Sequence, residues 1–148
     1  MLLEKIKSLA AQGQTENIAI RRHLHANPEL SYQEFETCKF VQAQLTKIGI
    51  PFTVIATTGV LGIIEGKNPT KRVIALRADM DALPIVEENE VDYKSKNEGV
   101  MHACGHDVHT TILLGQLKFC GVCVMNLKGL LNYYSSQVKK KILAVQVI

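Results

Sequence analysis

The segment 101–110 concentrates side chains that bind metal ions. It reads Met-His-Ala-Cys-Gly-His-Asp-Val-His-Thr. Cys104 and His106 flank Gly105, whose backbone freedom allows both side chains to face one ion. Asp107 is available to accept a ring N–H as an outer partner. Thiolate plus imidazole suits zinc, manganese or a similar divalent ion better than calcium or magnesium. We therefore predict that Cys104 and His106 are metal ligands, in preference to a buried cysteine beside a solvated histidine.

A second group of acidic side chains lies upstream. Asp79 and Asp81 follow the apolar run 73–76, so their carboxylates should stand at the end of a buried strand. In α/β folds the chemistry is placed at strand ends. The alternative is a strand-end turn whose carboxylates cap a helix. We favour a role in the site.

Helices should precede these two groups. Apolar residues recur at helical spacing over 2–9 and 15–25, and Pro28 stops the pattern, so we expect two N-terminal helices. Ser31-Tyr-Gln-Glu34 matches a capping box at the start of a further helix, which should end at Gly49. The roles of the remaining histidines stay open between structural support and the rim of a substrate site, namely His23, His25, His102 and His109.

The hydrophobic period changes from residue 50 onward. Strands are expected at 50–55, 60–65 and 73–77, with a turn at 66–72. A run of charged residues predicts an exposed excursion over 83–99. A helix at 108–114 should present Cys104 and His106 at its N-terminal end. Helices followed by strands predict the α/β class.

Composition narrows the function classes. The chain has 148 residues, 47% of them hydrophobic and 21% charged, which allows one domain with a sizeable core. With a net charge of +3 and 5% aromatic residues, the sequence offers neither a basic surface for phosphates nor aromatic side chains for base stacking, so no nucleic-acid partner is expected. No apolar stretch is long enough for a membrane span. Charge at Glu4 comes too early for a signal peptide, so we expect a cytoplasmic protein.

Three motifs together resemble one enzyme family. In chain order the motifs are Arg21-Arg-His-Leu-His-Ala-Asn-Pro-Glu-Leu-Ser31, Ala75-Leu-Arg-Ala-Asp-Met-Asp-Ala-Leu-Pro84 and His102-Ala-Cys-Gly-His-Asp107. They resemble metal-dependent amidohydrolases of the aminoacylase/carboxypeptidase family, in particular the hippurate, N-acyl-amino-acid and indole-acetyl-amino-acid hydrolases. The resemblance covers about residues 15–115.

The resemblance implies a fold and a reaction. The chain would be a truncated first half of a dimetal hydrolase catalytic domain, with N-terminal helices plus the first strands of a mixed sheet. Cys104 and His106 match metal-binding positions, and Asp79 and Asp81 match the acidic pair beside the metals, with Asp81 favoured for orienting a ligand. One or two zinc or manganese ions would activate water against the amide bond of a small N-acyl amino acid. The oligomeric state is not implied.

The resemblance stops after Gly115. The family continues into a strand that ends in Gln-Pro-Ala/Ser-Glu-Glu, which supplies the catalytic glutamate, whereas 116–148 contains no acidic residue. Permitted codons for 126–148, read from the third base of Asn126, can encode Phe-Lys-Gly-Thr-Ile-Lys-Leu-Leu-Phe-Gln-Pro-Ser-Glu-Glu. We therefore predict a catalytic-domain part at 1–115 and a frameshifted tail at 116–148. No catalytic residue is then assigned, and this chain alone should be inactive.

Two alternatives remain. The chain could be a non-enzymatic remnant that binds metal through Cys104 and His106. Cys120-Gly-Val-Cys123 could instead form a small redox or zinc site. The second alternative is less favoured, because no strand and turn of thioredoxin type precede this motif and no second Cys/His pair follows it.

Overall fold

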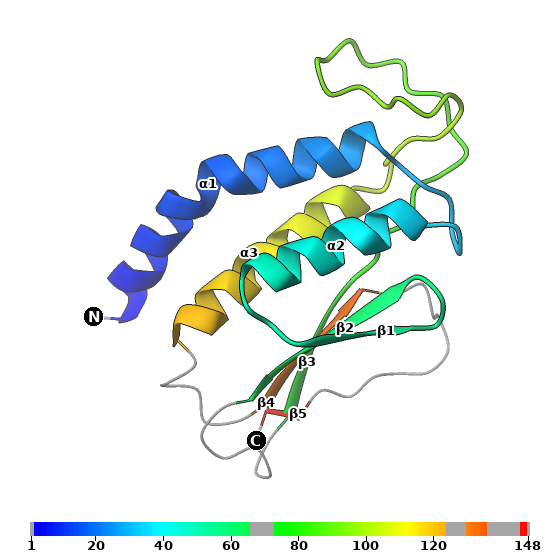
Figure 1. Cartoon of the computed structure of the whole chain (residues 1–148). Coiled ribbons are helices and arrows are strands. Elements are labelled where there is room, and N and C mark those ends of the chain that lie inside the picture. The colour runs from blue at the N-terminus through cyan, green and yellow to red at the C-terminus, as the bar shows by residue number, and fades with distance from the viewer. Residues whose placement is uncertain (1, 66–72, 124–129, 136–145, 148) are drawn as a thin grey trace.

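Three helices lie along one face of a sheet (Figure 1). The computed structural model describes residues 2–65, 73–123, 130–135 and 146–147. The elements in chain order are α1 (Leu2–Ala26), α2 (Phe35–Lys47), β1 (Phe52–Ile55), β2 (Gly59–Glu65), β3 (Val73–Ala78), α3 (His106–Cys123), β4 (Leu130–Ser135) and β5 (Gln146–Val147).

The sheet is mixed, and its order is β1-β2-β4-β3-β5. β2 pairs antiparallel with both β1 and β4, whereas β3 pairs parallel with β4 and antiparallel with β5. Helices that cover a mixed sheet confirm the predicted α/β class, as do the strands near the three expected positions. The predicted turn at 66–72 lies outside the described residues.

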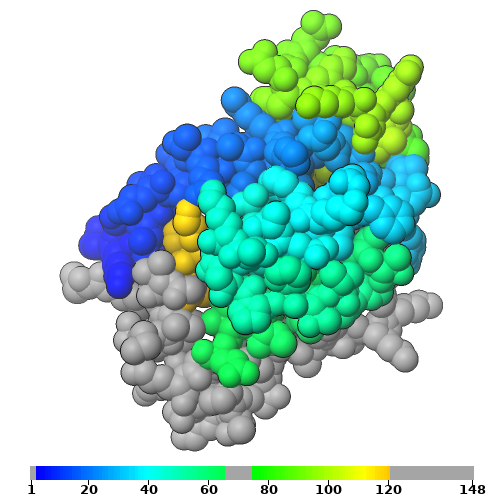
Figure 2. Space-filling view, viewed as in Figure 1, coloured from blue at the N-terminus to red at the C-terminus, as the bar shows by residue number. Residues whose placement is uncertain are grey.

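One hydrophobic core joins the helices to the sheet. It takes side chains from every helix and from β2 and β3, with Val41, Leu45, Val60 and Leu117 fully inaccessible to solvent. In the space-filling view α1 and α2 lie side by side, and the segment after β3 projects beyond their ends (Figure 2). The core therefore fixes α1, α2 and α3 relative to the end of β3.

The N-terminal helix is continuous, so the prediction of two helices is wrong. α1 runs unbroken over Leu2–Ala26, with Gly13 inside it. A single interior glycine costs a helix only about 1 kcal/mol, and no proline is present before Pro28. At Gly13 a side chain of α3 comes close, because Phe119 would lie 3.9 Å from an added Cβ. Packing against α3 therefore supports the helix where its local propensity is weakest.

The predicted capping box at Ser31-Tyr-Gln-Glu34 is also wrong. α2 begins at Phe35, and Glu34 makes no side-chain capping hydrogen bond. Its carboxylate is buried instead and accepts a hydrogen bond from the Thr58 hydroxyl at 2.8 Å. The N–H groups of Glu36 and Thr37 in the first turn of α2 donate to the Glu29 carboxylate, at 3.1 and 2.7 Å. A carboxylate from outside the expected motif thus caps this helix.

The end of α2 is as predicted. Gly49 adopts φ of +75°. The N–H of Gly49 donates to the carbonyl of Thr46 at 3.0 Å, and the N–H of Ile50 donates to the carbonyl of Leu45 at 3.0 Å. These two bonds form a Schellman motif, which explains the glycine at this position.

Candidate metal centre

His106 is oriented by Asp81. The His106 Nδ1 lies 2.8 Å from an Asp81 carboxylate oxygen and 2.9 Å from the Asp81 carbonyl oxygen. Because both neighbours are acceptors, Nδ1 must carry the hydrogen, which leaves the lone pair of Nε2 for an ion. The two side chains are 19% and 13% exposed, so the pair is shielded and still reachable. This is the arrangement in which a carboxylate fixes a metal-binding histidine.

Cys104 lies two residues before His106, just ahead of the start of α3. Its thiol is exposed and unpaired, and Gly105 between the two candidate ligands adopts φ of +78°. Such a backbone conformation is readily available only to glycine. α3 begins at His106, as the prediction of a helix that presents both residues required.

The donor types fit a divalent transition metal, but their number is small. A thiol and an imidazole with a carboxylate partner suit zinc or a similar ion. Among the residues that the structure describes, no group of three or more His, Cys, Asp or Glu side chains is placed to hold an ion. Cys104 and His106 could therefore supply only part of the ligands of a metal site.

Asp79 has different partners from Asp81. Its carboxylate forms an ion pair with Arg77, and its carbonyl oxygen accepts a hydrogen bond from the Thr110 hydroxyl at 3.0 Å. The Thr110 bond joins the end of β3 to the first turns of α3. Of the two predicted acidic residues, Asp81 is thus the one in contact with a candidate ligand, while Asp79 contributes to the connection between strand and helix.

Asp107 contacts a histidine ring nitrogen, as the sequence suggested, but the ring is that of His25. It is 1% exposed, and its Oδ2 lies 2.7 Å from Nδ1 of His25 and 3.0 Å from Nε of Arg21. The other ring nitrogen of His25 lies 2.9 Å from Glu87. Sequence reasoning left His25 open and placed Glu87 in an exposed run. Together these side chains form a buried charge cluster that no sequence motif announced.

Glu87 is the one acidic side chain of its segment that is buried. Burial raises its pKa, but hydrogen bonds from His25, from the N–H of Ser95 and from Asn89 outweigh burial and lower the pKa to about 2. The Ser95 N–H bond is 2.6 Å long. Glu87 therefore stays ionised next to His25 at ordinary pH.

The other histidines have different surroundings. His102 is 5% exposed, and neither of its ring nitrogens has a hydrogen-bond partner. Burial lowers its pKa to about 4, so the ring is neutral near pH 7. His23 is exposed and stacks on Phe40 with ring centroids 4.1 Å apart. His109 lies near His106, with ring centroids 5.7 Å apart.

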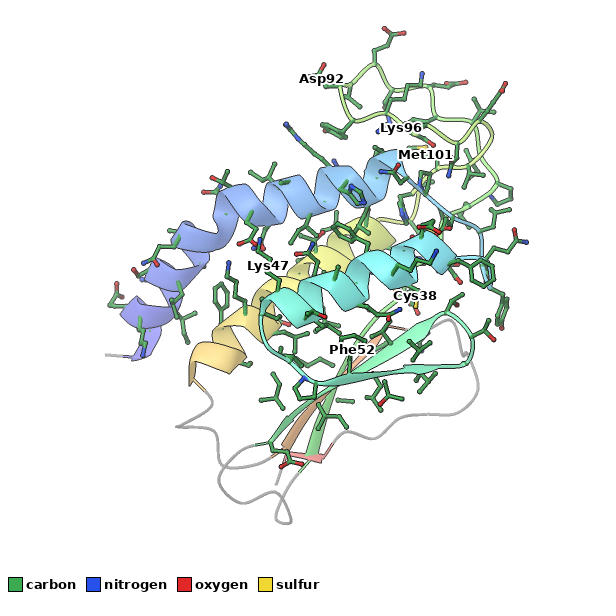
Figure 3. All side chains as sticks on the ribbon, in the orientation of Figure 1. Cys38, Lys47, Phe52, Asp92, Lys96 and Met101 are labelled. Atoms are coloured by element: carbon green, nitrogen blue, oxygen red, sulfur yellow. The ribbon has the colours of Figure 1, made fainter. Side chains whose placement is uncertain are left out.

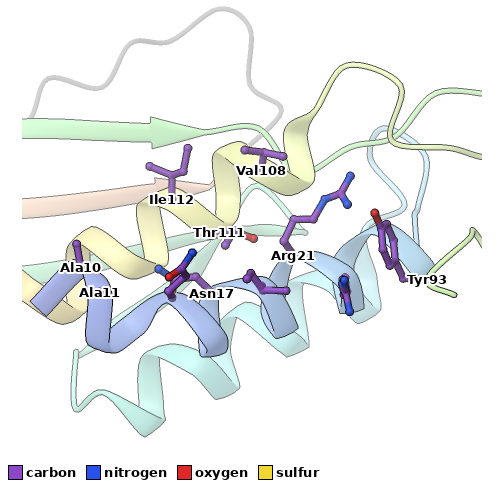
Figure 4. Close-up of a pocket in the computed structure, with 11 residues that line it drawn as sticks. Ala10, Ala11, Asn17, Arg21, Tyr93, Val108, Thr111 and Ile112 are labelled. Carbon is purple, nitrogen blue, oxygen red and sulfur yellow. The ribbon is translucent and has the colours of Figure 1, made fainter. Parts of the chain in front are cut away.

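A shallow groove of about 660 Å³ runs between α1 and α3 (Figure 4). Its lining is largely apolar, and Arg21 and Tyr93 stand together at one end, with the guanidinium carbon 5.0 Å from the ring centroid. Arg21 also pairs with Asp107, so the groove ends at the charge cluster. In a different part of the molecule, the Cys120 side chain packs against the hydrophobic core. This contact is a structural role for Cys120.

Known proteins share these motifs in the same fold. The model of peptidase family M20/M25/M40 matches residues 75–125, which include both acidic residues and both candidate ligands. An N-acyl-L-amino acid amidohydrolase of Geobacillus stearothermophilus is 47% identical over 134 residues, which are 90% of this chain and 36% of that protein. The chain belongs to the M20/M25/M40 family.

Further members of the M20 family agree with this assignment. An IAA-amino acid hydrolase of Arabidopsis thaliana is 53% identical over 68% of this chain and 23% of its own length. The Bacillus subtilis YXEP protein, described as a dinuclear metal binding peptidase from the M20 family, superposes with a TM-score of 0.78 at 41% identity, over 82% of this chain and 34% of that one. The chain thus spans between 23% and 36% of the length of these relatives and corresponds to their N-terminal part.

The M20 relatives are hydrolases, and the family includes dinuclear metal proteins, so a divalent metal belongs to the family's chemistry.

The predicted boundary at residue 115 lies inside α3, which runs on to Cys123, and it stays a prediction. None of the helices in the described residues is long and apolar enough to cross a membrane.

Proposed function

We propose that the complete protein hydrolyses the amide bond of N-acyl amino acids, and that Cys104 and His106 supply part of its metal site. The observation that carries the proposal is the contact of Asp81 with Nδ1 of His106, which leaves Nε2 available to an ion. A bound zinc or manganese ion would lower the pKa of a water molecule to roughly 7 and polarise the amide carbonyl. The names of the relatives support this substrate class.

In this proposal the residues of the chain hold and orient. Cys104 and His106 bind the ion, and Asp81 keeps the His106 ring in one tautomer and one orientation. Asp79 fixes the end of β3 against α3 through its carbonyl bond to Thr110. The unpaired thiols of Cys38 and Cys104 agree with a reducing compartment, and we propose the cytoplasm.

We further propose that 116–148 is read in a shifted frame, so that this chain alone does not hydrolyse substrate. The segment offers no carboxylate for proton transfer. A site with two protein ligands is also weak and open to solvent. The chain would then act at most as a metal-binding remnant, and the partial donor set of the described residues favours this second candidate.

The decisive experiment restores the frame. A one- or two-base change near the codons for 115–119 should yield a longer protein that contains the Pro-Ser-Glu-Glu motif. We expect that protein to hydrolyse N-acyl amino acids in a metal-dependent manner, whereas the 148-residue chain should not. A restored protein whose Cys104→Ser variant is as active as its parent would contradict the proposed metal site. Strong activity of the 148-residue chain would contradict the proposed inactivity.

A further inference from the structure

A single buried histidine joins three segments that are distant in the sequence. His25 near the end of α1 is 4% exposed. Its Nδ1 lies 2.7 Å from Asp107 on α3, and its Nε2 lies 2.9 Å from Glu87 in the segment between β3 and α3. Each ring nitrogen of His25 therefore lies within hydrogen-bond distance of one carboxylate, and Nδ1 also lies 3.1 Å from Nη2 of Arg21. Arg21 brings a positive charge to Asp107, with its Nε 3.0 Å from Oδ2.

One end of this bridge is the excursion 83–101. Its neck is closed by two backbone hydrogen bonds between Leu83 and Met101, of 2.9 and 3.0 Å. Figure 3 shows Asp92 far out on the excursion, with Lys96 and Met101 closer to the helices. The N–H of Lys96 donates to the carbonyl of Ala26 at 2.9 Å, which fastens the segment to the end of α1. Glu87 is the buried carboxylate that reaches inward from the excursion, and the Tyr93 ring also meets the His25 ring edge-on, with centroids 5.6 Å apart.

The other end of the bridge is the first turn of α3. Asp107 is 1% exposed and directly follows the candidate ligand His106. Its second carboxylate oxygen accepts a hydrogen bond from the N–H of Val108 at 2.9 Å. Whatever holds Asp107 in place therefore also holds the backbone that presents Cys104 and His106.

We propose that His25 is a positioning residue that clamps the excursion 83–101 and the start of α3 together, and so fixes the segment 102–106 that carries the candidate ligands. This inference rests on the proposed function, because the placement of 102–106 affects metal binding only through Cys104 and His106 as ligands. The alternative is that the bridge only adds stability to the whole fold. Buried charges that lose one partner are strongly disfavoured, so either role would make His25 sensitive to substitution.

A matched pair of variants distinguishes the two roles. His25→Gln removes the double bridge, since one amide cannot donate to both carboxylates in the same way. His23→Gln makes the same change two residues earlier on α1, at an exposed ring. If His25→Gln does not fold, Glu87→Gln tests the same bridge with a smaller change. Its control is Glu88→Gln, because Glu88 is exposed. Two quantities are measured on each chain, namely amide hydrogen exchange by segment without metal and the dissociation constant for Co²⁺.

We expect His25→Gln and Glu87→Gln to speed amide exchange in 83–106 by about tenfold or more, with little change in α2 and β2. The same variants should bind Co²⁺ about 10- to 100-fold more weakly, and the two controls should resemble the parent chain. Faster exchange spread evenly over the chain, exchange no faster than in the controls, or local loosening with unchanged Co²⁺ affinity would each overturn the proposal. If the parent chain binds no Co²⁺, the proposed metal site fails instead, and the exchange pattern alone decides whether His25 clamps these segments.

Discussion

Asp81 holds the ring of His106 through a contact of 2.8 Å between its carboxylate and Nδ1. The strand end and the helix start that carry these residues are 25 positions apart in the sequence. Their pairing joins two separate motifs and orients one candidate ligand. Metal binding by this chain should therefore depend on a carboxylate that does not need to touch the ion.

Replacing Asp81 tests that dependence. Asp81→Asn should weaken zinc binding about 10- to 100-fold, because a neutral amide holds the His106 ring and its tautomer less firmly. Asp79→Asn is the matched control. The Asp79 carboxylate pairs with Arg77, and the Asp79 side chain is 34% exposed. Competition with a chromophoric chelator measures both affinities. Equal losses in the two variants would show that the contact with His106 has no special role.

The packing of α3 beyond residue 115 has an energetic consequence. Leu117 is fully buried in the core, so Leu117→Ala should lower the free energy of unfolding by about 2–5 kcal/mol. Ile112→Ala on the same helix should cost less than about 1 kcal/mol, because that side chain is 53% exposed. Urea denaturation followed by circular dichroism gives both values. A small effect at Leu117 would mean that this part of α3 does not pack as described.

The free energy of unfolding at acid pH should depend on the ionisation of Glu87. Its pKa is lowered from 4.5 to about 2 in the fold, so the folded state binds the proton less readily than the unfolded state. The stabilisation is present above about pH 4.5 and is lost as the pH falls towards 2, and it is on the order of 3 kcal/mol. Unfolding free energies of the parent chain should decline across this window.

The matching variants isolate the contribution of this one carboxyl group. Glu87→Gln should be less stable than the parent at pH 6 and should show a flatter decline between pH 4.5 and 2. Glu88→Gln should follow the parent chain, because Glu88 is exposed. Parallel pH profiles for Glu87→Gln and the parent would contradict the lowered pKa.

Local signals predicted the parts of the fold that local chemistry decides. Gly49 marked the end of α2 because its positive φ is a property of one residue. The density of ligand types in 101–110 marked Cys104 and His106 as candidate ligands, and that assignment stays a prediction. Glu29 was missed as the cap of α2, because the preference for Ser31 and Glu34 considers only neighbouring residues, whereas tertiary packing drew Glu34 to Thr58.

The charge cluster could not be predicted from the sequence for a different reason. Its members, His25, Glu87 and Asp107, come from three segments that only the complete fold brings together. Glu87 stands in a charged run that looks like a solvated surface, and nothing in its neighbours distinguishes it from Glu88. The Arg-Arg-His-Leu-His motif was a signal that His25 has a role, but it did not indicate its partners.

The most direct measurement of the central claim is the absorption spectrum of the chain with Co²⁺. A thiolate bound to cobalt gives a charge-transfer band in the near ultraviolet, and we expect it for the parent chain and for His23→Gln. Cys104→Ser should lose the band, and His106→Gln should lose it or bind far more weakly. A parent chain without the band, or a Cys104→Ser variant that retains it, would contradict the assignment of Cys104 and His106 as metal ligands.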